Sequence, residues 1–203
     1  MIGIVNTNFG NINAIRNIYF EQGIECKSVS NHKEINDVDK IIIPGVGHFD
    51  SVIQNLKDQQ LFNIINELVI KEKMPILGIC IGMHIFFESS DEGSLKGFGW
   101  LDGVIRKLNS KSIRYPHMGW NNINLIKQNN LFREISNKSY FYFLHSYGND
   151  HDTKASYVST YTNYGNDIIS SIKFNNIYGV QFHPEKSHIN GAKLLSNFAS
   201  IND

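Results

Sequence analysis

Short apolar runs that alternate with helical patterns constrain the fold of this chain more than any other feature. Residues 1–5, 40–43 and 76–79 are continuous runs rich in isoleucine and valine, and residues 24–29 can form a further strand. Strands that are apolar on both faces are typical of parallel sheets covered by helices on both sides. Between these runs, apolar side chains recur at helical spacing, first at Ile12, Ile15, Ile18 and Tyr19, then at Val52, Leu56, Leu61, Ile64, Ile65, Leu68 and Val69.

The pattern changes after about Gly99. Six strand-like segments follow with few helical patterns between them, at residues 104–105, 122–126, 140–144, 155–162, 168–174 and 178–182. We expect them to be antiparallel or mixed additions to the same sheet, closed by a last helix around residues 192–198. The predicted fold is therefore α/β, with an open, mixed, mostly parallel sheet, helices on both faces and antiparallel additions in the C-terminal half. No linker, repeat or low-complexity tract divides residues 1–203, which we expect to form a single domain.

Charge and hydropathy indicate which kinds of partner the chain is not expected to bind. Lys plus Arg and Asp plus Glu number 19 each, so net charge predicts no nucleic-acid partner. No apolar run approaches the length of a membrane span, and the N-terminal residues do not resemble a signal peptide, so no membrane partner is expected. Two cysteines in a chain of this length are typical of reduced thiols in a cytoplasmic protein.

Four unusual turns follow the apolar strands. They are residues 6–11, 44–47 and 80–82 and the segment after Phe182. Ligands of open α/β sheets bind beyond the carboxyl ends of the strands. The sequence therefore predicts one site where these turns meet.

Cys80 stands between two glycines in the stretch Gly78-Ile79-Cys80-Ile81-Gly82. This spacing is typical of a nucleophile elbow, a sharp strand-to-helix turn that projects a reactive side chain. We expect a helix over residues 82–87, whose N-terminus would favour the thiolate. The amide of Ile81 would face a developing oxyanion. An inert core cysteine remains the alternative at this point.

A thiol nucleophile needs a base, and His183 follows the apolar run 178–182. Glu185, two residues further, is placed to fix the tautomer of the imidazole. Taken alone, His183 also fits an exposed loop histidine. In the turn Pro44-Gly45-Val46-Gly47, two glycines permit close approach of backbone to a ligand, although Pro and Gly also end strands for structural reasons.

Six stretches resemble, in order along the chain, the class I (triad) glutamine amidotransferases, and within them most closely the glutaminase subunits of imidazole glycerol phosphate synthases. The resemblance covers essentially the whole chain. The stretches are "IIIPGVGHF", "LGICIGMH", "FESSDEG", "PHMGWN", "FLHSY" and "GVQFHPEKS".

The resemblance implies a single glutamine amidotransferase domain with a Cys80–His183–Glu185 triad acting on glutamine. It implies an oxyanion hole from Ile81 and from the loop of Gly45, Val46 and Gly47. Further residues implied to bind substrate are Glu92, His84, His145, Ser146 and Tyr147, and those implied to contact the partner are His117, Met118, Trp120 and Asn121.

The implied partner is a (β/α)8-barrel cyclase subunit in a heterodimer. It would use the released ammonia to make imidazole glycerol phosphate and an aminoimidazole ribotide in histidine biosynthesis. No cofactor is implied, and no Cys/His cluster has metal-ligand spacing. The chain departs from the family at His84, where glutamine is usual, and at Asn6-Thr7-Asn8, where Asp-Tyr-Gly is common.

Three other functions remain open from the sequence. A paralogous glutaminase would supply ammonia to a nucleotide-sugar amidotransferase for surface-polysaccharide or flagellar sugar synthesis, with the same catalytic residues. A non-catalytic binding module of the same fold, or a redox-sensing protein that uses the thiol of Cys80, is a further alternative, and the presence of His183 and Glu185 argues against both. A cysteine hydrolase of γ-glutamyl peptides would not need the "PHMGWN" stretch.

Overall fold

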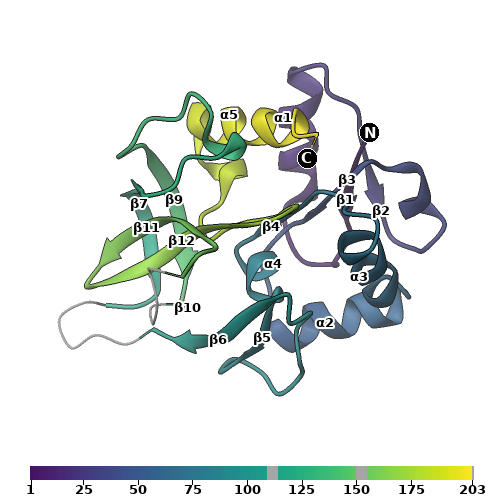
Figure 1. The fold of residues 1–203 in the computed structure, drawn as a ribbon, viewed down its shortest axis with the longest axis horizontal. Helices are drawn as coiled ribbons and strands as arrows, with labels where there is room; N and C mark the ends of the chain where they lie inside the picture. The colour runs from purple at the N-terminus through teal and green to yellow at the C-terminus, as the bar shows by residue number, and fades with distance from the viewer. Residues whose placement is uncertain (109–113, 150–154, 203) are drawn as a thin grey trace.

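The computed structural model describes residues 1–108, 114–149 and 155–202. Its centre is a sheet of eight strands, most of which can be followed in Figure 1. Five neighbouring strands are parallel, and three antiparallel strands extend the sheet at one side. The strand order is β2 (Cys26–Val29), β1 (Ile2–Val5), β3 (Lys40–Ile43), β4 (Ile76–Ile79), β13 (Ile177–Val180), β12 (Asn166–Phe174), β11 (Val158–Tyr164) and β8 (Asn124–Leu125).

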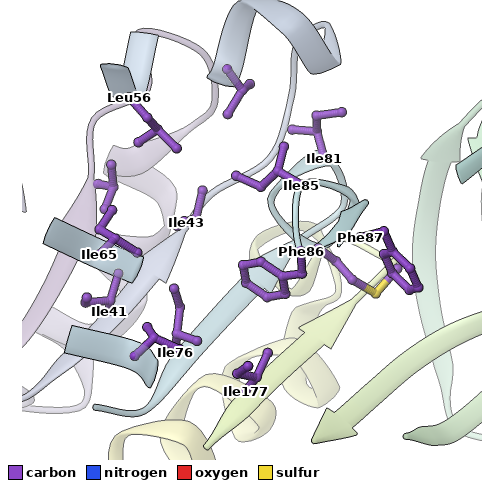
Figure 2. Close-up of a cluster of buried hydrophobic side chains, with 14 of the residues drawn as sticks. Ile41, Ile43, Leu56, Ile65, Ile76, Ile81, Ile85, Phe86, Phe87 and Ile177 are labelled. Atoms are coloured by element: carbon purple, nitrogen blue, oxygen red, sulfur yellow. The ribbon is translucent and has the colours of Figure 1, made fainter. Parts of the chain in front are cut away.

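Helices cover both faces of the parallel strands because alternate side chains of each strand point to opposite faces. Ile41 and Ile43 of β3 pack into the cluster that includes α2 (Phe49–Asp58) and α3 (Phe62–Ile70), which Figure 2 shows. Ile42, between them in sequence, packs instead with α1 (Ile12–Glu21) and α5 (His188–Ala199). Ile41, Ile42 and Ile43 are all 0% exposed, which explains why three consecutive positions of this strand are apolar.

The C-terminal half differs in part from the expectation. The segments at 155–162, 168–174 and 178–182 do join the main sheet, as β11, β12 and β13. The segment at 122–126 also contributes a short strand, β8, to the main sheet. The segments at 104–105 and 140–144 instead lie in two smaller sheets beside it. One contains β10 (Tyr147–Gly148), β6 (Leu101–Lys107) and β5 (Phe87–Ser90), and the other pairs β7 (His117–Asn122) with β9 (Tyr140–His145).

The helix expected over residues 82–87 is wrong in length. The structure has a single short helix, α4 (Ile81–His84), and β5 begins at Phe87. Residues 97–101 return along this segment, and the amides of Phe98 and Trp100 donate to the carbonyls of Ile85 and Phe86. These long-range backbone hydrogen bonds, absent from any local pattern, replace helical ones.

Among the helices of the described residues, none combines the length and the apolar character that crossing a membrane requires.

Candidate active site

Cys80 lies at the sharp turn from β4 into α4. Its backbone has φ 51° and ψ −108°, a conformation that side-chain-bearing residues rarely adopt and that is typical of functional sites. The turn is tight, since a Cβ atom on Gly78 would lie 2.4 Å from the carbonyl oxygen of Gly82. The spacing of the two glycines around Cys80 therefore follows from the closure of the turn.

The loop after β3 packs directly against this turn. A Cβ atom on Gly45 would lie 1.6 Å from the carbonyl oxygen of Ile79 and 2.8 Å from the amide nitrogen of Ile81. Only glycine allows such an approach. The loop of Gly45, Val46 and Gly47 and the amide that follows Cys80 thus border the same space.

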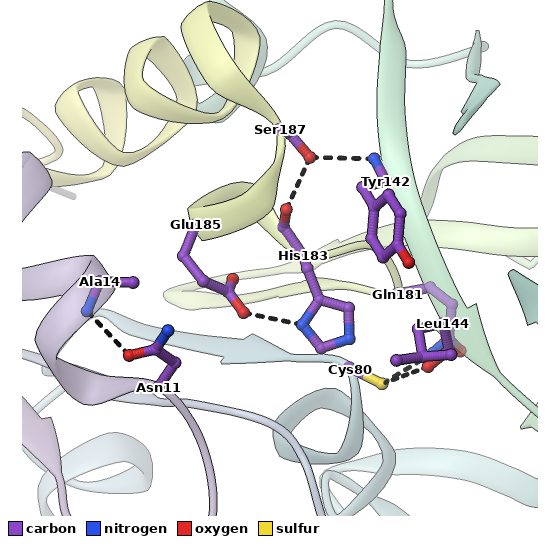
Figure 3. A network of polar contacts seen from close by, with 9 residues as sticks. All are labelled: Asn11, Ala14, Cys80, Tyr142, Leu144, Gln181, His183, Glu185 and Ser187. Atoms are coloured by element: carbon purple, nitrogen blue, oxygen red, sulfur yellow. Dashed lines mark hydrogen bonds and ion pairs between the residues drawn. The ribbon is translucent and has the colours of Figure 1, made fainter. Parts of the chain in front are cut away.

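His183 reaches Cys80 from the neighbouring strand. The end of β13 is aligned with the end of β4, with Val180 opposite Ile79, and the amide of Cys80 donates to the carbonyl of Val180 at 2.7 Å. Three residues beyond β13, the amide of His183 donates to the carbonyl of Tyr142 in β9 at 2.8 Å. Ser187 links the same two strands, because its hydroxyl donates to the His183 carbonyl and accepts from the Tyr142 amide (Figure 3).

The buried imidazole of His183 is oriented by Glu185. Nδ1 of His183 lies 2.8 Å from Oε1 of Glu185, so Nδ1 carries a proton and donates it. Nε2 points toward the Cys80 sulfur in Figure 3, and none of the described residues offers it a hydrogen-bond partner. The thiol itself lies 3.9 Å from the carbonyl oxygen of Leu144. This is the arrangement of nucleophile, base and orienting carboxylate.

Charge rather than burial controls the protonation of His183. Burial lowers its pKa, but the neighbouring Cys80 sulfur and then the Glu185 carboxylate oppose burial and raise the pKa to about 10. The imidazolium form of His183 is consequently favoured at neutral pH. In this form His183 can act as an acid beside the Cys80 sulfur.

A cavity of about 340 Å³ opens beside Cys80, at the lower end of the range for small-molecule sites. It brings together ten of the residues expected at the site. They are Gly45, Val46, Gly47, Cys80, Ile81, His84, Glu92, His145, Ser146 and Tyr147, and Pro116 and Leu144 complete the lining.

Glu92 is held at the rim of this cavity by the start of α2. One carboxylate oxygen accepts a hydrogen bond from the amide of Phe49 at 2.9 Å. Asp50, which follows Phe49 in α2, accepts hydrogen bonds from the amides of Ser94 and Leu95 and so fixes the segment that follows Glu92. A carboxylate positioned in this way can bind an ammonium group of a ligand.

His145 is the second histidine of the cavity wall, and it belongs to a directional chain. The carbonyl oxygen of Tyr147 accepts from Nδ1 of His145 at 2.9 Å, which leaves Nε2 as an acceptor. Nδ1 of His117 then donates to it at 3.0 Å, and Nε2 of His117 accepts from the Asn121 amide at 3.3 Å. Burial lowers the pKa of His117 to about 4 and that of His145 well below its usual range, so both rings are neutral.

The four residues expected to contact a partner do not share one face. Met118 and Trp120 alternate on the exposed side of β7, with 60% and 46% of their surface accessible. His117 is enclosed between the rings of Phe143 and Tyr164, and Asn121 is occupied with His117 and the Asn163 carbonyl. Contact with a partner stays a prediction for all four residues, and only Met118 and Trp120 are exposed enough for direct contact through their side chains.

Sequence reasoning overlooked Gln181. Its side-chain amide lies 3.5 Å from the Cys80 sulfur and it is fully buried. Gln181 and His183 are two residues apart beyond the end of β13, and both side chains approach Cys80, while Phe182 between them stacks on Phe141 (Figure 3). That spacing from His183 was the available signal.

In the ranges 1–108, 114–149 and 155–202, no group of three or more His, Cys, Asp or Glu side chains is arranged to hold a metal ion.

Comparison with known proteins extends these observations. The family model described as glutamine amidotransferase class-I matches residues 5–201. The imidazole glycerol phosphate synthase subunit HisH of Leptospira borgpetersenii is 41% identical over 205 residues, covering 99% of this chain and 100% of that protein. The subunit HisH 2 of Methanococcus maripaludis is 42% identical over 199 residues, covering 98% of each chain.

Solved structures agree at the level of the fold. The crystal structure of a glutamine amidotransferase superposes with a TM-score of 0.76 at 15% identity, covering 98% of this chain and 99% of that one. PurLQS from Thermotoga maritima gives a TM-score of 0.75 at 17% identity, covering 97% and 96% of the two chains. The α/β fold class and the resemblance seen in the six sequence stretches are thereby confirmed. This chain belongs to the class-I glutamine amidotransferase family.

Proposed function

We propose that this chain is the glutaminase subunit of an imidazole glycerol phosphate synthase, which hydrolyses glutamine and passes the ammonia to a cyclase subunit. The observation that carries the proposal is Cys80, which faces the Glu185-oriented imidazole of His183 and opens into a cavity bordered by Glu92. The full-length relationship to HisH subunits at about 40% identity supports the choice of synthase.

Catalysis begins with attack of the Cys80 thiolate on the carboxamide carbon of glutamine, whose carbonyl oxygen becomes an oxyanion. Amides of Ile81 and of the loop 45–47 stabilise this charge. The His183 imidazolium donates its Nε2 proton to the departing nitrogen, so that the C–N bond breaks and ammonia leaves. A γ-glutamyl thioester remains on Cys80.

The second half of the reaction uses the now neutral His183. Its Nε2 removes a proton from water, which attacks the thioester carbon, and glutamate leaves as the C–S bond breaks. The Cys80 thiolate and the His183 imidazolium are restored. Glu92 holds the α-amino group of the substrate throughout, and Glu185 keeps the imidazole in one tautomer.

A partner is needed for a physical reason. Ammonia released into water at neutral pH becomes ammonium, which has no lone pair with which to attack. Transfer through a water-excluding passage into a (β/α)8-barrel cyclase would keep it nucleophilic. The exposed Met118 and Trp120 on β7 form the contact surface that we assign to this partner.

Ammonia release from glutamine by the purified chain tests the proposal, alone and with a cyclase carrying its phosphoribosyl nucleotide. We expect turnover to rise strongly with the loaded cyclase, with the loop 45–47 as the responding element. Cys80→Ala should abolish release in both conditions. Equal turnover with and without the cyclase, or activation by a nucleotide-sugar amidotransferase instead, would contradict the assignment to this synthase.

The contact surface has its own test. Trp120 stacks on His188 at 5.1 Å between ring centroids and remains half exposed, as an interface anchor requires. Trp120→Ala should weaken cyclase binding by about 2 kcal/mol, measured by calorimetry. Phe20→Ala is the matched control, because Phe20 is an exposed aromatic residue on α1, 85% accessible. An equal effect of both substitutions would remove β7 from the interface.

A further inference from the structure

Gln181 approaches the Cys80 sulfur from the side of β13 and is fully buried. Its Nε2 donates to Sγ of Cys80 at 3.5 Å, a normal distance for an N–H···S hydrogen bond. Its backbone is fixed, since the Gln181 amide donates to the Ser170 carbonyl at 2.9 Å. The sulfur therefore has His183 as one neighbour and a neutral donor, Gln181, as another.

The orientation of this amide is set by His84. Nε2 of His84 lies 2.7 Å from Oε1 of Gln181, and both side chains are buried. When Nε2 carries the proton, Oε1 must be the acceptor, so the amide NH₂ is left facing the sulfur. The opposite orientation would aim the amide oxygen at the sulfur, which is repulsive once the sulfur is an anion.

Burial keeps His84 uncharged. It lowers the pKa of His84 to about 4, although the hydrogen bond to Gln181 acts in the opposite direction. Nδ1 of His84 is buried and has no hydrogen-bond partner among the described residues, so a second proton there would be unpaired. At neutral pH the ring can thus give Gln181 only the single Nε2 proton.

We propose that Gln181 is a hydrogen-bond donor that stabilises the thiolate of Cys80, and that His84 is a positioning residue that fixes the orientation of the Gln181 amide. The inference deepens the proposed function and rests on Cys80 as its nucleophile. The family usually has glutamine at the position of His84. In this chain His84 would act on the sulfur indirectly, through the orientation of the Gln181 amide.

The pH dependence of Cys80 alkylation by iodoacetamide tests this in the full-length chain. A Cys26→Ser background leaves one thiol, and the rate is followed by mass spectrometry. Gln181→Met, of similar length but without a donor, should raise the pH midpoint of alkylation by about one unit, because a hydrogen bond to the anion is lost. The rate at pH 7 should fall about tenfold.

Two substitutions at His84 isolate the positioning role. His84→Phe keeps an aromatic ring but removes the donor, and should raise the midpoint by a smaller amount than Gln181→Met. His84→Gln keeps an N–H that can reach Oε1 of Gln181 and should restore the midpoint to within about 0.3 pH units, well below the loss expected from a full hydrogen bond. A packing role alone would not rank these two substitutions in this way.

Unchanged midpoints in Gln181→Met, or equal midpoints in His84→Phe and His84→Gln, would overturn the proposal. If Gln181→Met does not fold, the isosteric Gln181→Glu decides, because a carboxylate beside the sulfur should raise the midpoint further. Alkylation requires no glutamine turnover. Failure of ammonia release would therefore count against the proposed function alone, and an unchanged midpoint in an active enzyme against this inference alone.

Discussion

The two sides of the Cys80 sulfur present the same type of residue in opposite states. On one side burial lowers the pKa of His183, but the Cys80 sulfur and the Glu185 carboxylate together raise it to about 10. On the other, His84, paired with Gln181, has its pKa lowered to about 4. Both rings are buried. The difference shows that the charge of the partner, rather than the degree of burial, decides which histidine can act as an acid.

The two histidines can play different roles because their charge states differ. A protonated imidazole can give a proton to a leaving group, whereas a neutral imidazole is a far weaker acid and serves as a base or as a hydrogen-bond partner. Gln181 and His183 come from the segment that follows β13, whereas His84 is the last residue of α4, the short helix that follows β4. Three predictions test the difference between the two histidines.

Removing the charge from the His183 side should have the largest effect. Glu185→Gln keeps the shape of the side chain, but it no longer stabilises the imidazolium or its tautomer. We expect the turnover of glutamine with the loaded cyclase to fall about 10³–10⁴-fold, as in other triads that lose their carboxylate. Glu134→Gln, at an exposed ion pair with Lys193, is the control and should leave turnover within about twofold. A loss below tenfold in Glu185→Gln would argue against a charge role.

Removing the sulfur should separate the two histidines spectroscopically. In Cys80→Ala the negative neighbour of His183 disappears, and its pKa should fall by about one to three units from about 10. The pKa of His84 should remain near 4, since its causes are burial and Gln181. Histidine ring resonances followed by NMR across the pH range measure both values. Parallel shifts of the two rings would mean that they share one electrostatic environment.

The smallest effect concerns stability. His84 has a pKa of about 4 in the folded protein, against a usual value of about 6.5 when unfolded. The unfolded protein therefore binds a proton more readily, so the contribution of His84 to the free energy of unfolding is fully present above pH 6.5 and is lost as the pH falls toward 4. His84→Gln removes this titration. Between pH 7 and pH 4.5 the free energy of unfolding should therefore fall by about 2 kcal/mol less in His84→Gln than in the unsubstituted protein. Urea unfolding at the two pH values measures it. His117 and His145 retain their own contributions, so a residual dependence of the same sign is expected.

Much of the site was accessible from sequence because it depends on local rules. Isoleucine-rich runs separated by helical patterns predict parallel strands, and parallel strands bring their carboxyl ends together. This is why the turns at Cys80, at Gly45 and after Phe182 could be assigned to one place. The register of β3, β4 and β13 puts them there.

Other features could be decided only by tertiary structure. Residues 85–87 have a helical pattern, yet the returning segment 97–101 offers them backbone partners and makes Phe87 the start of a strand. His117 appears in sequence beside the exposed Met118, yet the strand alternation of β7 turns it inward between Phe143 and Tyr164. In both cases the competing contacts come from residues distant in the chain.

The fold class, the family and the candidate triad can be predicted from sequence, because periodicity, glycine spacing and short motifs are local. The protonation states of the buried histidines and the contact of Gln181 with the sulfur follow only from the folded arrangement. Those depend on which groups lie within a few ångströms of each buried ring and of the sulfur, and no spacing along the chain specifies that.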